Sequence, residues 1–224
     1  MKQLFGSLKI SVNEQLYLKD PESSQLGRNI IEHSILLIDE IGFDGLTFKK
    51  LGSAIGSNES SVYRYFENKH KLLLYLTSWY WGWIEYQLVF ETHNIFDKSE
   101  KLKKAIEIIC RPIVEDSSYG HINEVLLNKI VINEFSKSYL TKEVDMENKE
   151  GYFAIYKRLV HRLDEMIREK DDSYGYPTSL ASTIIETALH QQFLKDHFKS
   201  ITDCDAKTSP SDFLTDLIFK LLKK

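Results

Sequence analysis

The sequence predicts an all-α protein. From Glu22 onward the apolar residues recur mostly at spacings of three and four, which is the period of an amphipathic helix. Only 4 Pro and 10 Gly interrupt the 224 residues, so long helices with short connections are expected. A content of 42% hydrophobic and 28% charged residues is typical of a folded domain and excludes a disordered or collagen-like chain.

The first residues differ from the rest of the chain. Leu8 to Val12 alternate between apolar and polar side chains, which is the pattern of an extended segment, and Asp20-Pro21 ends it. We therefore expect residues 1–21 to form an N-terminal arm, to which the sequence assigns no function.

Four helices are expected next, of which the second is short and the fourth is long. The first begins between Glu22 and Gln25 and ends at Gly42. The second runs from Thr47, whose hydroxyl caps it, to Ile55, and Gly56 stops it because glycine readily adopts a left-handed conformation. The third spans Glu59–Tyr65 behind a cap at Ser57 or Asn58. The long fourth helix starts at Lys69, capped by Asn68.

The remaining sequence predicts five further helices. Their starts are marked by signals such as the capping-box sequence at Asp97–Glu100 and the Ser209-Pro210 pair. The expected ranges are Lys98–Glu115, His121–Phe135, Asp145–Lys170, Thr178–Phe198 and Pro210–Leu222. With the arm set aside, the chain is expected to divide into a domain of residues 22–70 and a larger one of residues 71–224.

The segment from Gly45 to Lys71 has the sequence form of a helix-turn-helix, two short helices around a glycine turn. It carries five basic residues and two acidic ones, a local balance of +3, although the whole chain has a net charge of −4. A recognition helix presents its first residues to base edges, and helix N-termini offer amide groups to phosphates. The expected DNA-binding residues are Thr47, Lys49, Asn58, Glu59, Ser60, Ser61, Tyr63, Arg64, Tyr65 and Lys69, of which Glu59, Ser60 and Arg64 are the candidates for reading bases.

These residues also resemble a known family. Gly42-Phe43, Leu46-Thr47, Ile55-Gly56, the run Ser61–Phe66 and Asn68-Lys69 are similar to the DNA-binding domain of TetR-type transcriptional regulators. The resemblance implies that Thr47, Ser61, Tyr63, Tyr65 and Lys69 touch DNA phosphates. It further implies about nine helices, a C-terminal effector domain, and a homodimer formed through the last two helices, whose two heads reach successive major grooves. Two departures stand out: Tyr65 replaces the more usual histidine, and Glu59 places an acid at the DNA.

Candidate effector and dimer residues follow from apolar faces. Trp79, Trp83 and Tyr86 lie at spacings of four and three, and a second wall is expected from Ile109, Cys110, Phe153 and Tyr156. Such aromatic stripes also form ordinary cores, and this alternative stays open. The last two helices present Ile184, Ile185, Ala188, Leu189, Phe213 and Leu217, which pack within the chain, against a second copy, or both.

Other function classes have little support. The sequence contains no GxSxG, Walker-type or GxGxxG motif, so an enzyme is not expected, and no cofactor is implied. No metal site is expected, because His190 and His197 lack a third ligand and there is no HExxH motif. Cys110 and Cys204 form no CxxC pair, and no apolar run suits a signal peptide or membrane span, so a cytoplasmic protein without a membrane partner is expected.

The sequence thus predicts a DNA-binding transcriptional regulator, in the form of a repressor. It is expected to bind a palindromic operator as a homodimer and to be released by an unidentified small-molecule effector. The alternative is a helical small-molecule-binding or carrier protein that no longer binds DNA.

Overall fold

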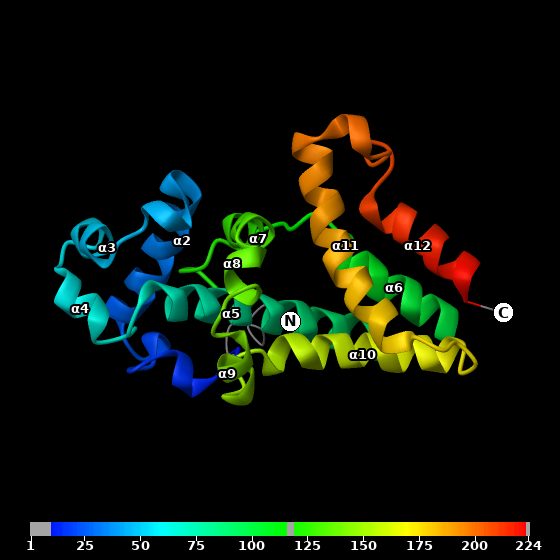
Figure 1. The fold of residues 1–224 in the computed structure, drawn as a ribbon, viewed down its shortest axis with the longest axis horizontal. Helices are drawn as coiled ribbons and strands as arrows, with labels where there is room; N and C mark the ends of the chain where they lie inside the picture. Colours follow the sequence, from blue (N-terminus) through cyan, green and yellow to red (C-terminus); the bar gives the residue numbers. More distant parts are fainter. Residues whose placement is uncertain (1–9, 116–118, 223–224) are drawn as a thin grey trace. The chain divides into compact units, whose positions relative to one another are not determined.

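The computed structural model describes residues 10–115 and 119–222, and this part of the chain is entirely helical with irregular connections (Figure 1). It contains the eleven α-helices α2 to α12 and three short 3-10 helices, and no strand is present among the described residues. The all-α prediction is confirmed. No helix in the described ranges combines the length and the apolar character needed to cross a bilayer.

The chain forms two compact units. The first takes its described residues from Met1–Gly82 and Ile113–Ile155, and the second from Trp83–Pro112 and Tyr156–Lys224. Helix α5 (Lys69–Thr92) begins in the first unit and ends in the second. The expected functional boundary after residue 70 stays a prediction.

Local capping signals position the helix-turn-helix within the first unit. Helix α2 (Gln25–Gly45) is capped by Ser24, α3 (Phe48–Ala54) by Thr47, and α4 (Glu59–Tyr63) by Asn58. Each capping side chain accepts a hydrogen bond from a first-turn amide, with donor–acceptor distances of 3.0 to 3.2 Å. Gly42 and Gly56 have φ values of 72° and 65°, so both turns use the left-handed conformation that favours glycine.

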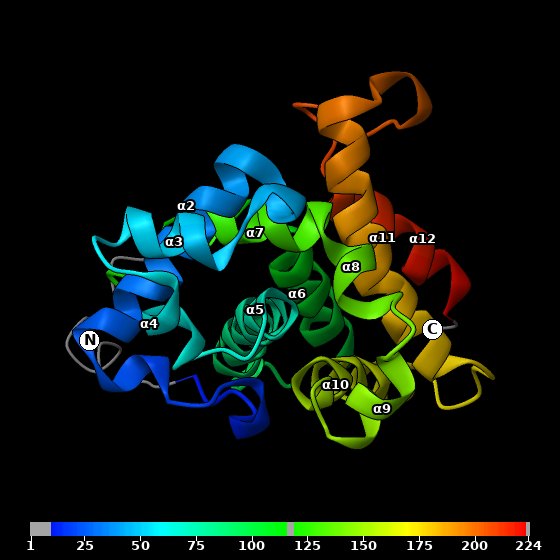
Figure 2. The same cartoon turned by 60° about the vertical axis from the view of Figure 1, so that its left-hand side comes forward.

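Gly52 brings α3 and α4 together. A Cβ atom at this position would lie 2.6 Å from the main-chain carbon of Asn58 and 2.8 Å from the nitrogen of Glu59. Only glycine allows this approach, which places the beginning of α4 directly against α3 (Figure 2). The angle between α4, the recognition helix, and α3 therefore depends on the absence of a side chain at position 52.

The first unit also contains α7 (Glu124–Asn133), α8 (Phe135–Tyr139) and α9 (Val144–Lys149). Helix α7 packs beside α2 in both ribbon views. The described part of the arm belongs to the same unit. Ile10 and Val12 are buried, Leu16 in the 3-10 helix Glu14–Leu16 is fully enclosed, and a Cβ at Gly82 would meet Ile10 at 2.6 Å. Leu8 and Lys9 lie outside the described residues.

The second unit is built from α6 (Lys98–Cys110), α10 (Ala154–Lys170), α11 (Pro177–His197) and α12 (Pro210–Leu221). Helix α6 contacts α11 and α12, which also contact each other. Ser209 caps α12 as predicted and also forms a capping box with Asp212, because each side chain accepts a hydrogen bond from the other's backbone amide. At the capping-box sequence predicted before α6, Asp97 accepts a hydrogen bond from the Glu100 amide at 2.8 Å. Buried Glu85 of α5 binds Arg158 and Arg162 of α10 at 2.6 and 2.7 Å.

Three predicted helices have the wrong limits. The expected helix Asp145–Lys170 is broken at Gly151, whose φ of 79° separates α9 from α10. The helix expected to reach Glu115 ends at Cys110, before Pro112, which cannot donate a backbone hydrogen bond. The helix expected from His121 starts at Glu124, because Asn123 caps it by accepting a bond from the Leu126 amide. The short α8 was not predicted.

Candidate nucleic-acid interface

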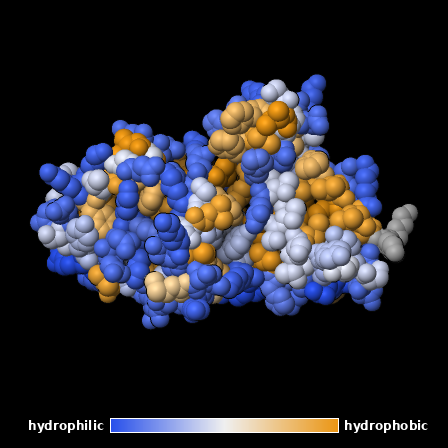
Figure 3. Space-filling model, in the orientation of Figure 1, coloured by the Kyte–Doolittle hydropathy of each residue, from blue (hydrophilic) through white to orange (hydrophobic). Residues whose placement is uncertain are grey.

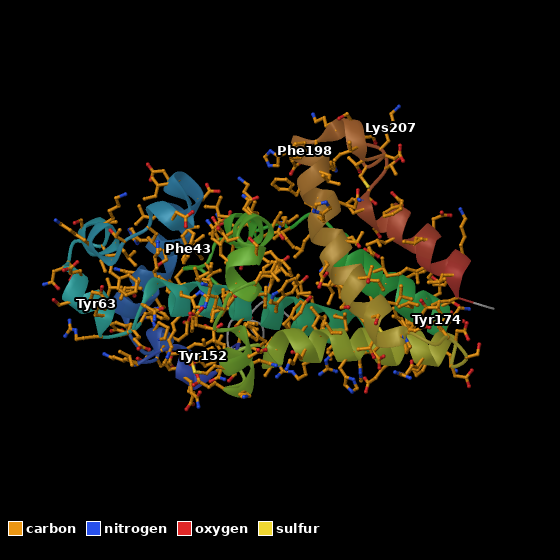
Figure 4. All side chains as sticks on the ribbon, viewed as in Figure 1. Phe43, Tyr63, Tyr152, Tyr174, Phe198 and Lys207 are labelled. Carbon is orange, nitrogen blue, oxygen red and sulfur yellow. The ribbon has the colours of Figure 1, made fainter. Side chains whose placement is uncertain are left out.

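The outer surface of α4 and its neighbouring turns is polar. Tyr63 is 50% exposed, with its ring edge against Phe48 at a centroid distance of 4.8 Å. Figure 4 shows Tyr63 at this edge of the first unit. Of the residues expected to contact DNA, those that are exposed are Thr47, Lys49, Asn58, Glu59, Ser60, Tyr63 and Arg64. Val62 and Phe66 are fully buried and anchor the same segment from inside.

Ser61 has a mainly internal role. Its side chain is buried, and its hydroxyl donates a hydrogen bond to the Asn58 side-chain oxygen at 3.2 Å. The same hydroxyl accepts hydrogen bonds from the Ser57 hydroxyl at 2.9 Å and from an Arg64 nitrogen at 3.1 Å. The Arg64 guanidinium is thereby held at the end of α4. Ser61 therefore holds neighbouring residues of this surface in place and adds little exposed area of its own.

Tyr65 is also turned inward. It is 2% exposed, and its hydroxyl shares a 2.7 Å hydrogen bond with the hydroxyl of Ser24, the cap of α2. Lys19 of the arm lies 5.1 Å above its ring. Burial raises the pKa of Tyr65, but Ser24, Lys19 and Arg64 together lower it below its ordinary value. The tyrosine that replaces the family's usual histidine therefore links the arm, α2 and the recognition segment.

Lys69 caps a loop in this structure. Its ammonium group donates to the main-chain oxygens of Phe43, Asp44 and Leu46 at 3.1, 3.2 and 3.3 Å, and it lies 4.8 Å from the Phe43 ring centroid. These carbonyls follow the left-handed turn at Gly42, and the Phe43 oxygen also accepts a hydrogen bond from the Leu46 amide at 3.2 Å. The ammonium group therefore stabilises the connection between α2 and α3.

Sequence reasoning missed two exposed residues at this surface. Ser57 lies beside Ser61, and Lys50 donates from its ammonium group to the Gly45 oxygen at 2.9 Å. The signal was available, because Ser57 precedes the α4 cap and Lys50 follows Lys49 in the same first turn of α3. Glu67 pairs with Lys71 at 2.8 Å, so one of the two acids in this region is offset locally.

The predicted effector residues fall in both units. In the first, Trp79 and Phe153 are buried, with ring contacts to Tyr119 and Tyr139 at 5.0 and 5.3 Å. In the second, Trp83 and Cys110 are buried, whereas Tyr86 stacks on Phe90 at 6.0 Å. Burial raises the pKa of the Cys110 thiol to about 12 and that of Tyr156 above its ordinary value, whereas Ile109 is half-buried. Their role in effector binding stays a prediction.

The second unit has a shallow groove between α5 and α10. Leu88, Val89 and Met166 supply apolar surface, and Lys101 and Arg162 supply positive charge. Both cations are already paired, Lys101 with Glu169 at 3.2 Å and Arg162 with Glu85 at 2.7 Å. The groove therefore offers an amphipathic lining with little unpaired charge.

The predicted dimer residues separate into two groups. Ile184, Ile185 and Ala188 are buried within the second unit, and Leu189 is half-buried. Phe213 and Leu217 are 40% and 43% exposed, and Leu221 continues their stripe at 46%. Figure 3 shows hydrophobic surface over α12. The exposed apolar face thus lies on α12.

Comparison with known proteins supports the resemblance found in the sequence. Residues 30–76 match the family described as "Bacterial regulatory proteins, tetR family". No curated protein matches the chain significantly.

Solved structures share the fold at low sequence identity. AibR, crystallised with isovaleryl coenzyme A and operator DNA, is 18% identical, with 87% of this chain and 97% of that one covered and a TM-score of 0.57. The fatty acid degradation regulator FadR from Bacillus halodurans is 16% identical, covers 88% and 94%, and has a TM-score of 0.60. The superantigen PfiT is 15% identical, covers 92% and 100%, and has a TM-score of 0.62. The family match spans most of α2, all of α3 and α4 and the start of α5, so the helix-turn-helix segment of this chain is similar to that of the tetR family of bacterial regulatory proteins.

Proposed function

We propose that this chain is a transcriptional repressor that binds a palindromic operator as a homodimer and is released by a small-molecule effector. The observation that carries the proposal is the polar, exposed face of α4, held in position by the caps of α3 and α4. A short helix mounted in this way suits insertion into the major groove. The family match to residues 30–76 supports the same role.

The exposed side chains divide by chemistry. Thr47, Lys49 and Tyr63 carry hydroxyl or ammonium groups, which suits contacts to phosphates. Ser60 and Arg64 suit base edges, and Glu59 suits acceptance of a hydrogen bond from a cytosine amino group. Ser61, Tyr65 and Lys69 act chiefly by shaping this surface, because their polar atoms bond the protein itself.

The homodimer is proposed from α12. Phe213, Leu217 and Leu221 recur every four residues and are exposed in the single chain, so a second copy would remove them from water. A single head makes few contacts, whereas two heads about 34–36 Å apart read successive turns of a palindrome. Ile184, Ile185 and Ala188 would support this face from the core.

Effector release is proposed as a population shift. A ligand lowers operator affinity if it binds more tightly to a spacing of the two heads that no longer fits the two half-sites, whereas a ligand with equal affinity for both spacings has no effect. The residues predicted for its site remain Trp79, Trp83, Tyr86, Ile109, Cys110, Phe153 and Tyr156. Because AibR was crystallised with isovaleryl coenzyme A, short acyl coenzyme A thioesters are reasonable first probes.

The test is selection of bound sequences from a random DNA pool at near-physiological salt, with a Tyr63→Ala variant in parallel. Tyr63 is half-exposed, so this variant should fold. We expect the wild type to enrich a palindrome and the variant to lose that enrichment. A folded, dimeric wild type that enriches nothing would reject the proposal.

The carrier alternative has one supporting observation. The superantigen PfiT shares the fold across its whole chain, so the fold alone does not establish DNA binding. Failure of the selection, combined with ligand-induced quenching of Trp79 or Trp83 fluorescence, would favour this alternative.

A further inference from the structure

Residues 43–46 follow the kink at Gly42 of α2 and lead into α3, and they are called the connection between α2 and α3 below. This connection is held by residues that lie outside the matched family region. Glu134, between α7 and α8, accepts a hydrogen bond from the Phe43 amide at 3.3 Å, and it is 8% exposed. Lys137 of α8 binds Asp44 at 2.8 Å and Glu134 at 2.9 Å. These four residues, Phe43, Asp44, Glu134 and Lys137, are called the Phe43 junction below.

Phe43 lies between two cations. The ammonium group of Lys69 is 4.8 Å from its ring centroid and that of Lys137 is 5.8 Å away. Each contact is attractive because the ring face carries negative charge density. Phe43 is 6% exposed, and Figure 4 shows it at the end of α2. The loop that leads into α3 is thus clamped from α5 on one side and from α8 on the other.

The α8 side of the junction is itself fixed. The Glu134 amide donates to the Ile130 oxygen at 2.8 Å, which ends α7, and its own oxygen accepts from the Lys137 amide at 3.0 Å. Two residues after Lys137, the Tyr139 hydroxyl accepts a 2.7 Å hydrogen bond from Trp81 of α5, and its ring lies 5.3 Å from Phe153. Both ends of α8 are therefore held within the first unit.

We propose that Glu134 and Lys137 are positioning residues for DNA binding, which set the geometry of the helix-turn-helix through the connection between α2 and α3. The inference rests on the proposed function. Thr47, which caps α3, lies directly after this connection, so movement of residues 43–46 changes the presentation of α3 and, through Gly52, of α4. Neither residue lies within the matched range 30–76, so the DNA-binding unit extends beyond the recognised domain.

The test compares variants by their dissociation constants for the selected operator and by the dependence of binding on salt. We expect Lys137→Met to raise the constant about five- to thirty-fold, because only the fraction with a correctly placed head binds. The salt dependence should keep the wild-type slope, since no phosphate contact is lost. Lys137→Arg should recover most of the affinity. Lys129→Met is the matched control, because Lys129 of the neighbouring α7 is 57% exposed and makes only a long ion pair of 3.9 Å with Asp39.

Two further comparisons separate positioning from general stability. Glu134→Gln keeps an oxygen acceptor for the Phe43 amide, so it should impair binding less than Glu134→Met. In a double-mutant cycle of Asp44→Asn and Lys137→Met, the double variant should bind the operator as tightly as the single variant with the lower affinity, because the two residues act as a pair. All constants are measured at a temperature where thermal unfolding shows every variant folded.

The outcomes are distinct. If the folded variants bind with the wild-type constant, or if only their melting temperature falls, the positioning role is rejected and the proposed function stands. If Lys137→Met lowers the salt slope by about one, Lys137 is a phosphate contact and the proposal is also rejected. If the wild type selects no DNA sequence, the proposed function and the positioning role fail together.

Discussion

The helix-turn-helix and the last two helices expose side chains of opposite character. Around α4 the exposed residues are polar, and their positions are fixed by capping hydrogen bonds and by the glycine at position 52. On α12 the exposed residues include an apolar stripe, in which Phe213, Leu217 and Leu221 lie above a buried row. The first surface suits a hydrated, charged partner such as DNA, whereas the second suits another apolar surface.

The two regions also depend on different kinds of interaction. The recognition segment is a short helix that relies on caps, a close backbone approach and the Phe43 junction. Helices α11 and α12 are longer and bury a continuous row including Ile184, Ile185, Leu214 and Ile218. Small backbone changes should therefore disturb the first region most, and changes of surface polarity should disturb the second.

The largest effect is expected from Gly52→Ala. In a helix this substitution normally stabilises by about 1 kcal/mol, but here the new Cβ would meet the Asn58 backbone at 2.6 Å. We expect a net loss of about 2 kcal/mol in the free energy of unfolding, together with loss of operator binding. Urea denaturation checks the first effect. Ser53→Ala, at the exposed neighbouring position, should change stability by less than about 0.5 kcal/mol. A stabilised Gly52→Ala protein would refute the close approach.

The next effect tests the apolar stripe of α12. Leu217→Asp should weaken the proposed dimer by about a hundredfold, because it would place an unpaired charge in an apolar contact. The monomer should stay folded, since Leu217 is 43% exposed within the single chain. Light scattering after size-exclusion chromatography measures the mass. The adjacent Asp216→Asn serves as control, and an unchanged dimer mass in Leu217→Asp would move the interface away from α12.

A matched pair of lysines tests the polar region. Lys49→Ala should reduce the salt slope of operator binding by about one unit, as expected for one lost phosphate contact. Lys69→Ala should instead lower the free energy of unfolding by about 1–2 kcal/mol, because three main-chain oxygens lose a charged donor. Titrations at several salt concentrations and urea denaturation separate the two effects. If the slope falls for Lys69→Ala alone, the phosphate role passes from Lys49 to Lys69.

The same contrast explains what the sequence predicts well. Caps, glycine turns and helix starts depend on neighbouring residues, so Thr47, Asn58, Asn68 and Ser209 all cap where expected. Burial depends on distant residues. Periodicity alone therefore did not show that Ser61 and Tyr65 point inward, or that Lys69 bonds the connection after α2.

The Phe43 junction had no readable signal. Glu134 and Lys137 are separated from Phe43 by about ninety positions, and an isolated acid on a helix is ordinarily exposed. Gly151 was the opposite case, because a glycine within a periodic segment is a visible sign of a helix break.

The smallest effect concerns a tie within the second unit. The carboxylate of Asp164 in α10 is bonded by Arg168 at 2.9 Å and by Thr178, at the start of α11, at 2.8 Å. The hydrogen bond from Arg168 holds the pKa of Asp164 below its usual value, although burial acts in the opposite direction. A lowered pKa in the folded state stabilises the protein above the unfolded pKa of about 3.9, and this stability is lost as the pH falls further.

Asp164→Asn should therefore lower the free energy of unfolding by about 1 kcal/mol at neutral pH, and the deficit should shrink toward zero below about pH 4. Urea denaturation of both proteins between neutral and acid pH measures the difference. Asp216→Asn removes an exposed pair with Lys220 and should leave stability nearly unchanged at every pH. A deficit that stays constant with pH would show that Asp164 acts through packing alone. The stability of the second unit would then come from apolar contacts without help from a charged hydrogen bond. In this it would differ from the recognition segment, which depends on polar contacts such as its helix caps.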